Sequence, residues 1–364
     1  MKAFKEVFSR FAIEGEFIDC TLYGSGHIND TYIGRYLTPA GTECYIHQHI
    51  NHKVFQQPEK LMENVERVTS HLRRNIEAQG GDVLRETLNL VPTVDGQSFH
   101  VTPEGQCWRT YVFIEGARTY DVVEDRDMVL HAGRAFGRFQ RDLADLPGDC
   151  LHEIIPDFHN TQKRFQDLIT AVEQDAQNRA ASVKKEIDFA LDREKETSTI
   201  IKFIEDGLMP ERITHNDTKI NNVMIDDETH AGICVIDLDT VMPGSALYDF
   251  GDAVRSSASL AAEDEKDPAT VGLDLELYDR LACGYLKEAR EFLIEIEKQY
   301  LAFAAKLMTF ECGLRFLSDY LQGDNYFRVH RADHNLERCR TQFALVQDME
   351  RKMEEMERVV SKYT

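Results

Sequence analysis

The sequence predicts an α+β fold of two lobes, a small β-rich lobe over residues 1–116 and a larger, mainly helical lobe over residues 117–364. Residues 17–116 contain short apolar strand patterns separated by turn residues, with a single helical pattern among them. From about residue 125, apolar residues recur at helical spacing almost to the last residue. Within that helical part, residues 212–240 form a separate group of short strand patterns. Such segregated strands and helices are typical of α+β proteins.

The small lobe is expected to be a sheet crossed by one helix. Strand patterns occur at 17–23, 31–37, 44–49 and 108–114, and further short strands are expected around the turns Asp95-Gly96 and Glu104-Gly105. The helix begins near Pro58 and ends near Gln79, before Gly80-Gly81. Its apolar residues recur in steps of three and four, at Leu61, Val65, Val68 and Leu72.

The large lobe is expected to be helical on both sides of residues 212–240. Helical spacing covers Met128 to Leu143, predicts two further helices between residues 161 and 206, and resumes near Ser245. From Leu336 the apolar positions fit a long amphipathic helix that docks on this lobe. We expect a monomer. A coiled-coil dimer through this last helix is an open alternative, but few heptads are available for it.

Composition narrows the class of protein. The formal net charge is −22, from 64 acidic and 42 basic residues, so a nucleic acid or an anionic membrane is not expected as the main partner. No apolar run approaches membrane-spanning length, and the first residues contain no signal-peptide pattern. The eight cysteines are scattered singly, which favours a reducing compartment. We therefore expect a cytoplasmic protein.

The run from His215 to Asn222 carries the main chemical signal. Asp217 is followed five residues later by Asn222, and Asp237 stands about twenty residues on, after an apolar strand pattern. Protein kinases use this spacing to hold a base and metal ligands around a triphosphate. Asp217 is the candidate catalytic base. Asn222 and Asp237 offer the oxygen ligands that Mg²⁺ prefers.

Residues around this motif have supporting roles in the prediction. Lys219 is expected to contact the transferring phosphoryl group, with a solvated loop lysine as the equal alternative. His215 is expected to stabilise the loop, and Asp249 to accept hydrogen bonds from its backbone. For Asp239, a metal-related role and the capping of a helix remain alternatives.

The nucleotide is expected to lie between the lobes. Gly24, Ser25 and Gly26 form a glycine turn between two strands, where backbone N–H groups can approach phosphates. Gln48 on the third strand belongs to the same predicted site, as do two residues near the lobe junction, Phe113 and Glu115. Far along the chain, residues 311–327 form a polar and aromatic cluster that suits either sugar binding or a salt-bridge network.

The motifs H-N-D-T-K-I-N-N, I-D-L-D-T-V-M-P-G and Y-D-F-G-D-A-V-R resemble those of the aminoglycoside phosphotransferase-like kinases, which have a two-lobed, protein-kinase-like fold. Within that family, the chain resembles the N-acetylhexosamine 1-kinases over nearly its whole length, and the motifs at residues 311–326 and 335–350 are specific to these sugar kinases. The resemblance implies transfer of phosphate from ATP to the anomeric hydroxyl of N-acetylglucosamine or N-acetylgalactosamine, with Mg²⁺. It also implies that four residues lie near the sugar: His27, Arg315, Asp324 and Tyr326.

One position departs from the wider family pattern. The third strand usually carries a lysine or arginine that steadies the α- and β-phosphates, but Gln48 occupies the corresponding position here. Glu66 on the following helix is therefore expected to lack its usual partner. Two alternatives remain open from the sequence: a kinase of this fold acting on another sugar, an amino alcohol or an aminoglycoside, or a non-catalytic nucleotide-binding regulator. The preferred epimer and nucleotide are also left open.

Overall fold

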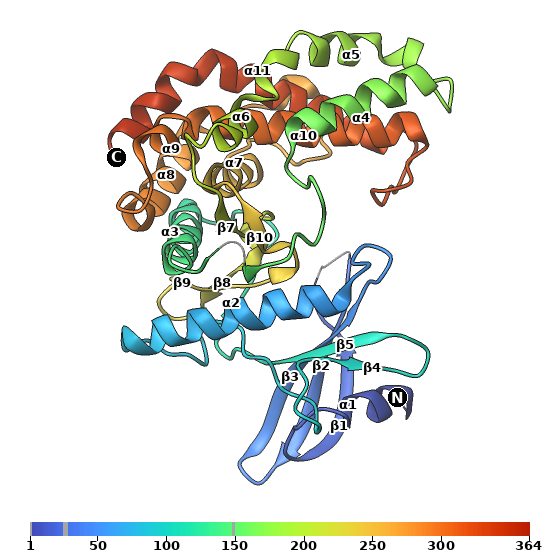
Figure 1. Ribbon diagram of the computed structural model, residues 1–364, viewed down its shortest axis with the longest axis vertical. Coiled ribbons are helices and arrows are strands. Elements are labelled where there is room, and N and C mark those ends of the chain that lie inside the picture. The colour runs from blue at the N-terminus through green and yellow to red at the C-terminus, as the bar shows by residue number, and fades with distance from the viewer. Residues whose placement is uncertain (1, 25–27, 148–149) are drawn as a thin grey trace.

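The computed structural model describes residues 2–24, 28–147 and 150–364. It has two lobes, and the small lobe is drawn below the large lobe in Figure 1. The predicted positions Ser25, Gly26 and His27 lie outside these residues. The elements of the small lobe are α1 (Lys2–Phe8), β1 (Glu16–Leu22), β2 (Asp30–Thr38), β3 (Gly41–Ile50), α2 (Pro58–Ala78), β4 (His100–Val101) and β5 (Cys107–Val112).

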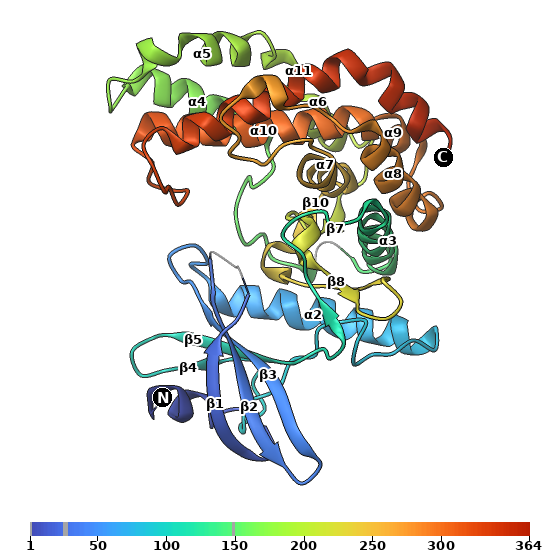
Figure 2. The same ribbon diagram turned by 180° about the vertical axis from the view of Figure 1, so that it is seen from behind.

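The strands of the small lobe form one antiparallel sheet with the order β1-β2-β3-β5-β4. Helix α2 lies between this sheet and the large lobe, as both views show (Figures 1 and 2). Its buried face consists of the residues expected from their spacing, among them Leu61, Val65 and Val68, each 0% exposed. The two-residue strand β4 is shorter than the strands expected around Asp95-Gly96 and Glu104-Gly105.

Helix α1 was not expected from the sequence. The ring of Phe8 stacks on the ring of His47 with centroids 3.7 Å apart, and Phe8 and Trp108 belong to the apolar cluster on this side of the lobe. The helix is too short to be stable alone, so this packing stabilises it.

The chain enters the large lobe between Val112, where β5 ends, and Ala117, where β6 begins. The α-helices and strands of this lobe are β6 (Ala117–Arg118), α3 (Arg126–Asp142), α4 (Thr161–Gln174), α5 (Lys184–Leu191), α6 (Thr199–Glu205), β7 (Arg212–Thr214), β8 (Val223–Asp226), β9 (Gly232–Val235), β10 (Met242–Gly244), α7 (Ala246–Ser257), α8 (Leu275–Ala289), α9 (Glu295–Gln299), α10 (Leu301–Gln322) and α11 (His334–Ser361). Strand β10 pairs with β7, and β8 pairs with β6 and β9.

The prediction of two helices between residues 161 and 206 was wrong. Three α-helices form there, because α4 ends at Asp175, whose φ of 38° is left-handed, and a 3₁₀ turn at Glu194–Glu196 separates α5 from α6. A left-handed residue satisfies the last carbonyls of a helix and stops it.

The last helix docks on the large lobe, as expected from its apolar spacing. Helix α11 packs along α10 and against α8, and it buries Cys339, Val346 and Met349 completely. No helix in residues 2–24, 28–147 and 150–364 is long and apolar enough to cross a membrane.

Helices α3 and α8 approach closely because glycines lie at their crossing. A Cβ added to Gly284 would lie 2.1 Å from the carbonyl oxygen of Leu130, and one added to Gly137 would lie 2.4 Å from that of Tyr285. Real Cβ atoms do not come so close to backbone, so the helices would have to separate.

We therefore expect Gly284→Ala to lower the free energy of unfolding by roughly 3 kcal/mol. Helix propensity alone predicts the opposite sign, a gain of about 1 kcal/mol. Urea unfolding followed by circular dichroism decides between them. Cys283→Ala, at the neighbouring residue of α8, is the control and should change stability little. A gain in stability for Gly284→Ala would show that the crossing has room.

Candidate active site

The catalytic loop follows β7, and one buried carboxylate binds its backbone. Asp249 of α7 accepts hydrogen bonds from the backbone N–H groups of His215 and Asn216, at 2.9 and 2.7 Å, and from the side chain of Gln140. Burial raises the pKa of Asp249, while His215 and these donors oppose the rise. The contacts fix Asn216 in a left-handed conformation with φ of 64°, which turns the chain toward Asp217.

His215 ties the same loop to the strand that leads to Asp237. Its Nε2 atom lies 2.8 Å from the carbonyl oxygen of Ile236, and its Nδ1 atom faces the backbone N–H of Asp217 at 3.3 Å. The Thr240 hydroxyl donates to the carbonyl of His215 at 2.7 Å. The loop and the strand end are therefore one rigid unit.

Asp217 lies among the polar groups expected of it. The Asn222 amide donates to the Asp217 carbonyl at 2.7 Å and to Oδ2 at 3.2 Å, and Lys219 Nζ lies 2.7 Å from Oδ1. Burial would raise the pKa of Asp217, but the Lys219 ammonium holds it below its ordinary value. The carboxylate is thus ionised at neutral pH and able to accept a proton from a hydroxyl.

Asp237 faces the space between the lobes. Its backbone is left-handed, with φ of 60°, and its exposed carboxylate makes no hydrogen bond or ion pair with any described residue. The surrounding protein, together with Asp239 and Asp217, raises the pKa of Asp237 to about 6. Nearby negative charges disfavour the ionised form of a carboxylate, and a bound cation would relieve that repulsion.

Asn222 and Asp237 fit a hard metal ion. Asn222 uses its amide N–H toward Asp217, which leaves its oxygen as a ligand, and Asp237 has both oxygens available. Among the described residues, no three His, Cys, Asp or Glu side chains form a metal cluster of their own. A metal here would complete its coordination with phosphate oxygens and water, as in kinases.

The nucleotide side of the site is described in part. Gly24 has φ of 78°, and the ring of Tyr23 lies edge-on to Phe113 with centroids 5.8 Å apart. Phe113 and Glu115 belong to the connection between the lobes, where Arg85 binds the carbonyl of Glu115 at 3.0 Å. These four residues lie at one edge of the predicted nucleotide site.

Gln48 lies in a network that sequence reasoning missed. Arg109 donates to Gln48 Oε1 at 2.9 Å and forms an ion pair with Asp239, Nη1 to Oδ1 2.5 Å. Glu66 is exposed on α2 and forms no ion pair with any described residue, in line with the expected loss of its partner. An arginine within a buried, largely apolar strand is the signal in the sequence that could have drawn attention to Arg109.

The predicted acceptor side of the site contains Arg315 of α10. Its guanidinium lies within 6 Å of three aromatic rings, with ring centroids at 5.1 Å for Phe158, 5.8 Å for Tyr326 and 5.5 Å for Phe327. Arg164 is close enough for the Arg315 charge, together with burial, to lower the pKa of Arg164, and its guanidinium lies 3.7 Å from the Asp167 carboxylate. Arg315 forms no ion pair with a described residue, so this wall of the predicted acceptor site carries an unpaired positive charge, which the nearby Glu311 carboxylate offsets in part.

A buried pair joins this wall to the catalytic loop. His159 Nδ1 lies 2.7 Å from Glu311, one helical turn before Arg315, and His159 Nε2 lies 2.9 Å from the carbonyl of Asn216. Burial would lower the pKa of His159, but the Glu311 carboxylate raises it above its ordinary value. Sequence reasoning missed His159, since nothing in the sequence indicates a partner 152 residues away.

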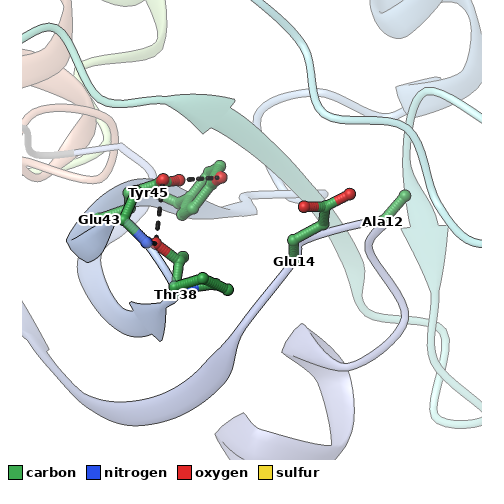
Figure 3. Close-up of a pocket in the computed structure, with 7 residues that line it drawn as sticks. Ala12, Glu14, Thr38, Glu43 and Tyr45 are labelled. Atoms are coloured by element: carbon green, nitrogen blue, oxygen red, sulfur yellow. Dashed lines mark hydrogen bonds between the residues drawn. The ribbon is translucent and has the colours of Figure 1, made fainter.

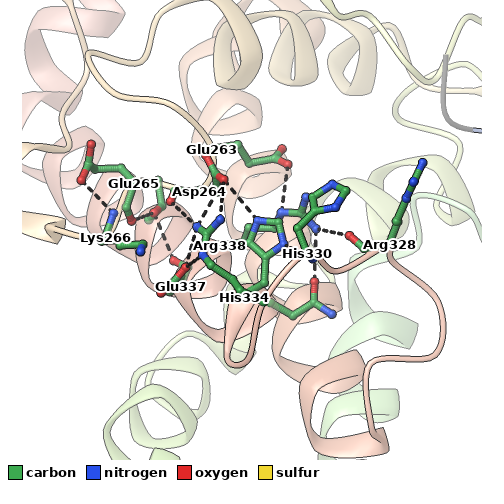
Figure 4. Close-up of polar contacts among 12 residues, drawn as sticks. Glu263, Asp264, Glu265, Lys266, Arg328, His330, His334, Glu337 and Arg338 are labelled. Atoms are coloured by element: carbon green, nitrogen blue, oxygen red, sulfur yellow. Dashed lines mark hydrogen bonds and ion pairs between the residues drawn. The ribbon is translucent and has the colours of Figure 1, made fainter. Parts of the chain in front are cut away.

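The charge of Arg255 acts on Asp217 of the catalytic loop, and its guanidinium is paired with two carboxylates. It is paired with Asp252 at 2.8 Å and with Glu263 at 3.0 Å. The Asp252 carboxylate also acts on Lys219, whose pKa is raised chiefly by Asp217. Figure 4 shows Glu263 in a group of charged and histidine side chains from the segment after α7, the segment before α11 and the start of α11. Arg255 is therefore held by ion pairs with α7 and with the segment after it.

The resemblance implies that Asp324 lies near the sugar. In the structure its carboxylate is bound by other side chains. Its two carboxylate oxygens contact Arg179 at 2.8 Å and the Asn335 amide at 2.9 Å. Neighbouring Asp319 accepts hydrogen bonds from the backbone N–H groups of Asn325 and Tyr326, both at 2.8 Å. Asp324 thus supports the turn that presents Tyr326, and direct contact of Asp324 with a substrate stays a prediction.

A pocket on the small lobe lies at the opposite end of the strands from Gly24, beside the β2–β3 turn (Figure 3). It is lined by Glu14, Thr38, Glu43 and Tyr45 among others, and Tyr45 donates to Glu43 at 3.1 Å. No described residue of the catalytic loop lines this pocket.

The fold and the loop define a kinase-type phosphotransferase with a small-molecule acceptor site. A sequence model of the Phosphotransferase enzyme family (APH) matches residues 20–283. The chain belongs to this family, whose members use ATP as co-substrate.

Solved structures of similar fold include the microcompartment-associated aminopropanol kinase, 14% identical over 98% of both chains with a TM-score of 0.60. An aminoglycoside phosphotransferase from Alicyclobacillus acidocaldarius is 12% identical over 98% of this chain and 96% of that chain, with a TM-score of 0.63. Choline kinase from Cryptosporidium parvum is 14% identical over 95% and 92%, with a TM-score of 0.55. These similarities confirm the predicted two-lobed, protein-kinase-like fold.

Proposed function

We propose that the protein transfers the γ-phosphate of Mg-ATP to the anomeric hydroxyl of an N-acetylhexosamine, giving the sugar 1-phosphate. The observation that carries the substrate class is the positive wall of the acceptor site. The aromatic rings that would enclose a cationic amine are already occupied by the Arg315 guanidinium. A second cation, Arg164, lies beside it.

This charge disfavours choline, amino alcohols and aminoglycosides, because like charges repel strongly where solvent is excluded. A neutral sugar with a carbonyl-bearing substituent suits the site better, since a guanidinium donates to carbonyl oxygens and aromatic faces pack against sugar rings. The sequence resemblance to N-acetylhexosamine 1-kinases supports the same substrate class independently.

In the proposed reaction, Asp217 accepts the proton of the anomeric hydroxyl as the oxygen attacks the γ-phosphorus. The bond from that phosphorus to the β,γ-bridging oxygen breaks, and ADP leaves. Lys219 holds Asp217 in place through its 2.7 Å contact and adds positive charge near the transferring group. Asn222 and Asp237 would hold Mg²⁺, which supplies charge neutralisation for the phosphate oxygens. His159 and Glu311 fix the loop against the acceptor wall.

A monomeric cytoplasmic enzyme is part of the proposal. All eight cysteines are free thiols, which suits a reducing compartment.

An ATP-consumption screen tests the substrate class. We expect turnover with N-acetylglucosamine or N-acetylgalactosamine and none with their 1-O-methyl glycosides, which lack the free anomeric hydroxyl. Choline, ethanolamine and an aminoglycoside are the cationic comparisons and should stay at background. Turnover of a methyl glycoside would refute the 1-hydroxyl assignment, and turnover of a cationic acceptor alone would select another substrate of the same fold. Nucleotide binding with no turnover would indicate a regulator.

A further inference from the structure

The third-strand position of the small lobe offers no positive charge, but the neighbouring strand does. Arg109 of β5 lies directly opposite Gln48 of β3 in the antiparallel register. Directly opposed residues point to the same face of a sheet. The Gln48 side chain accepts from Arg109 Nε at 2.9 Å and donates to Thr31 Oγ1 at 3.1 Å. Three strands thus orient one guanidinium on the face that carries Gln48.

The partner of this guanidinium comes from the large lobe. Arg109 Nη1 lies 2.5 Å from Asp239 Oδ1, and the two side chains are only 1% and 3% exposed. Asn29, two residues after the segment 25–27, donates to the other Asp239 oxygen at 2.6 Å. Separating such a buried pair leaves an uncompensated charge, which is strongly unfavourable. The pair therefore ties the two lobes together.

Helix α2 supplies no carboxylate to Arg109 within the described residues. The side chain that α2 places beside the guanidinium is Met62, whose sulfur lies 3.9 Å from Nη1, whereas Glu66 is exposed. The position that a helix glutamate would occupy is apolar. The only described carboxylate paired with Arg109 is therefore Asp239.

Asp239 is separated from Asp237 by a single residue. Both belong to the short segment in which Asp237 precedes the 3₁₀ turn Leu238–Thr240. Leu238 is 1% exposed, so this turn is anchored in the core as well. Fixing Asp239 to Arg109 consequently fixes Asp237 relative to the small-lobe sheet.

We propose that Arg109 is a positioning residue of the nucleotide site. Through its pair with Asp239, it replaces the missing strand-three cation and holds Asp237 at a set distance from the sheet that covers the nucleotide. Metal-bound phosphates then meet Asp237 without rearrangement of the turn. The proposal concerns the nucleotide and is independent of which acceptor is used.

Calorimetric titration of the full-length protein with Mg-ATP and, separately, with adenosine tests it. Arg109→Met is expected to weaken Mg-ATP binding at least tenfold and to change adenosine binding less than twofold, because only phosphate and metal contacts depend on Asp237. Adding Gln48→Lys to Arg109→Met should recover at least threefold, since an ammonium on β3 faces the same way. Asp239→Asn should weaken Mg-ATP binding as Arg109→Met does, and the double variant should be no worse than either, because the two residues act as one unit.

Arg193→Met is the matched control. Arg193 is also paired with a carboxylate, that of Glu350, through two contacts at 2.9 and 2.8 Å, but it joins the turn after α5 to α11. This variant should keep the wild-type affinity for Mg-ATP. The proposal is overturned if Arg109→Met binds Mg-ATP normally, if it loses adenosine in parallel, or if the Arg109 and Asp239 effects add. If Arg109→Met does not fold, Arg109→Lys with Asp239→Asn gives the same comparison.

Discussion

Replacing Asp217 with asparagine is expected to lower the turnover number by roughly 10³-fold, in the range found when a general base is removed. The amide cannot accept the proton of the acceptor hydroxyl, and Lys219 loses the carboxylate that lies 2.7 Å from its Nζ atom. The measurement is kcat at saturating Mg-ATP with the best acceptor of the screen. Affinity for Mg-ATP should change little, because Asn222 and Asp237 remain in place.

Asp227→Asn is the control for this experiment. Asp227 lies in the turn between β8 and β9 and pairs with Arg118 at 2.7 Å on the surface, so its neutralisation should leave kcat unchanged. An Asp217→Asn enzyme that kept a tenth or more of the wild-type kcat would show that another group accepts the proton.

Replacing Asp249 with asparagine is expected to have the second largest effect, on both activity and stability. The carboxylate receives two backbone N–H groups and the Gln140 amide. An asparagine would turn an amide N–H group toward one of these donors and leave it unsatisfied in a buried place, at a cost of about 1–3 kcal/mol. The loop would lose the conformation that presents Asp217, so we expect kcat to fall by about 100-fold.

Asp348→Asn separates the two effects. Asp348 is also a buried carboxylate that accepts from a backbone N–H group, that of Leu273 at 2.7 Å, but it lies on α11, away from the loop. Urea unfolding should show a loss of stability for both variants, whereas kcat should fall only for Asp249→Asn. Equal kcat values for Asp249→Asn and the wild type would mean that the loop holds its shape without the carboxylate.

Local patterns in the sequence predicted the fold because they depend on neighbouring residues. Helix α2 follows from the spacing of Leu61 to Leu72 and from its proline start, and the strands follow from their turns. The kinase spacing of Asp217, Asn222 and Asp237 is likewise local, because one loop and one strand carry it.

The remaining features depend on contacts across the chain. Helix α1 is stabilised by packing on the ring of His47. The charge of Arg109 is balanced by Asp239, which is 130 positions away. The pair of His159 and Glu311 likewise joins residues that are far apart in the sequence. Nothing in the neighbourhood of these residues specifies the partner, so the sequence could indicate an unusual buried charge but not what balances it.

The docking of α11 has a consequence for the order in which the protein matures. Helix α11 covers α10, the helix that carries Glu311 and Arg315, and it is synthesised after every other element described. The small lobe and α3 can form early during synthesis. Helix α10 gains this support only after residues 334–361 have been synthesised, so a nascent chain can form the small-lobe sheet before Glu311 and Arg315 are held in place.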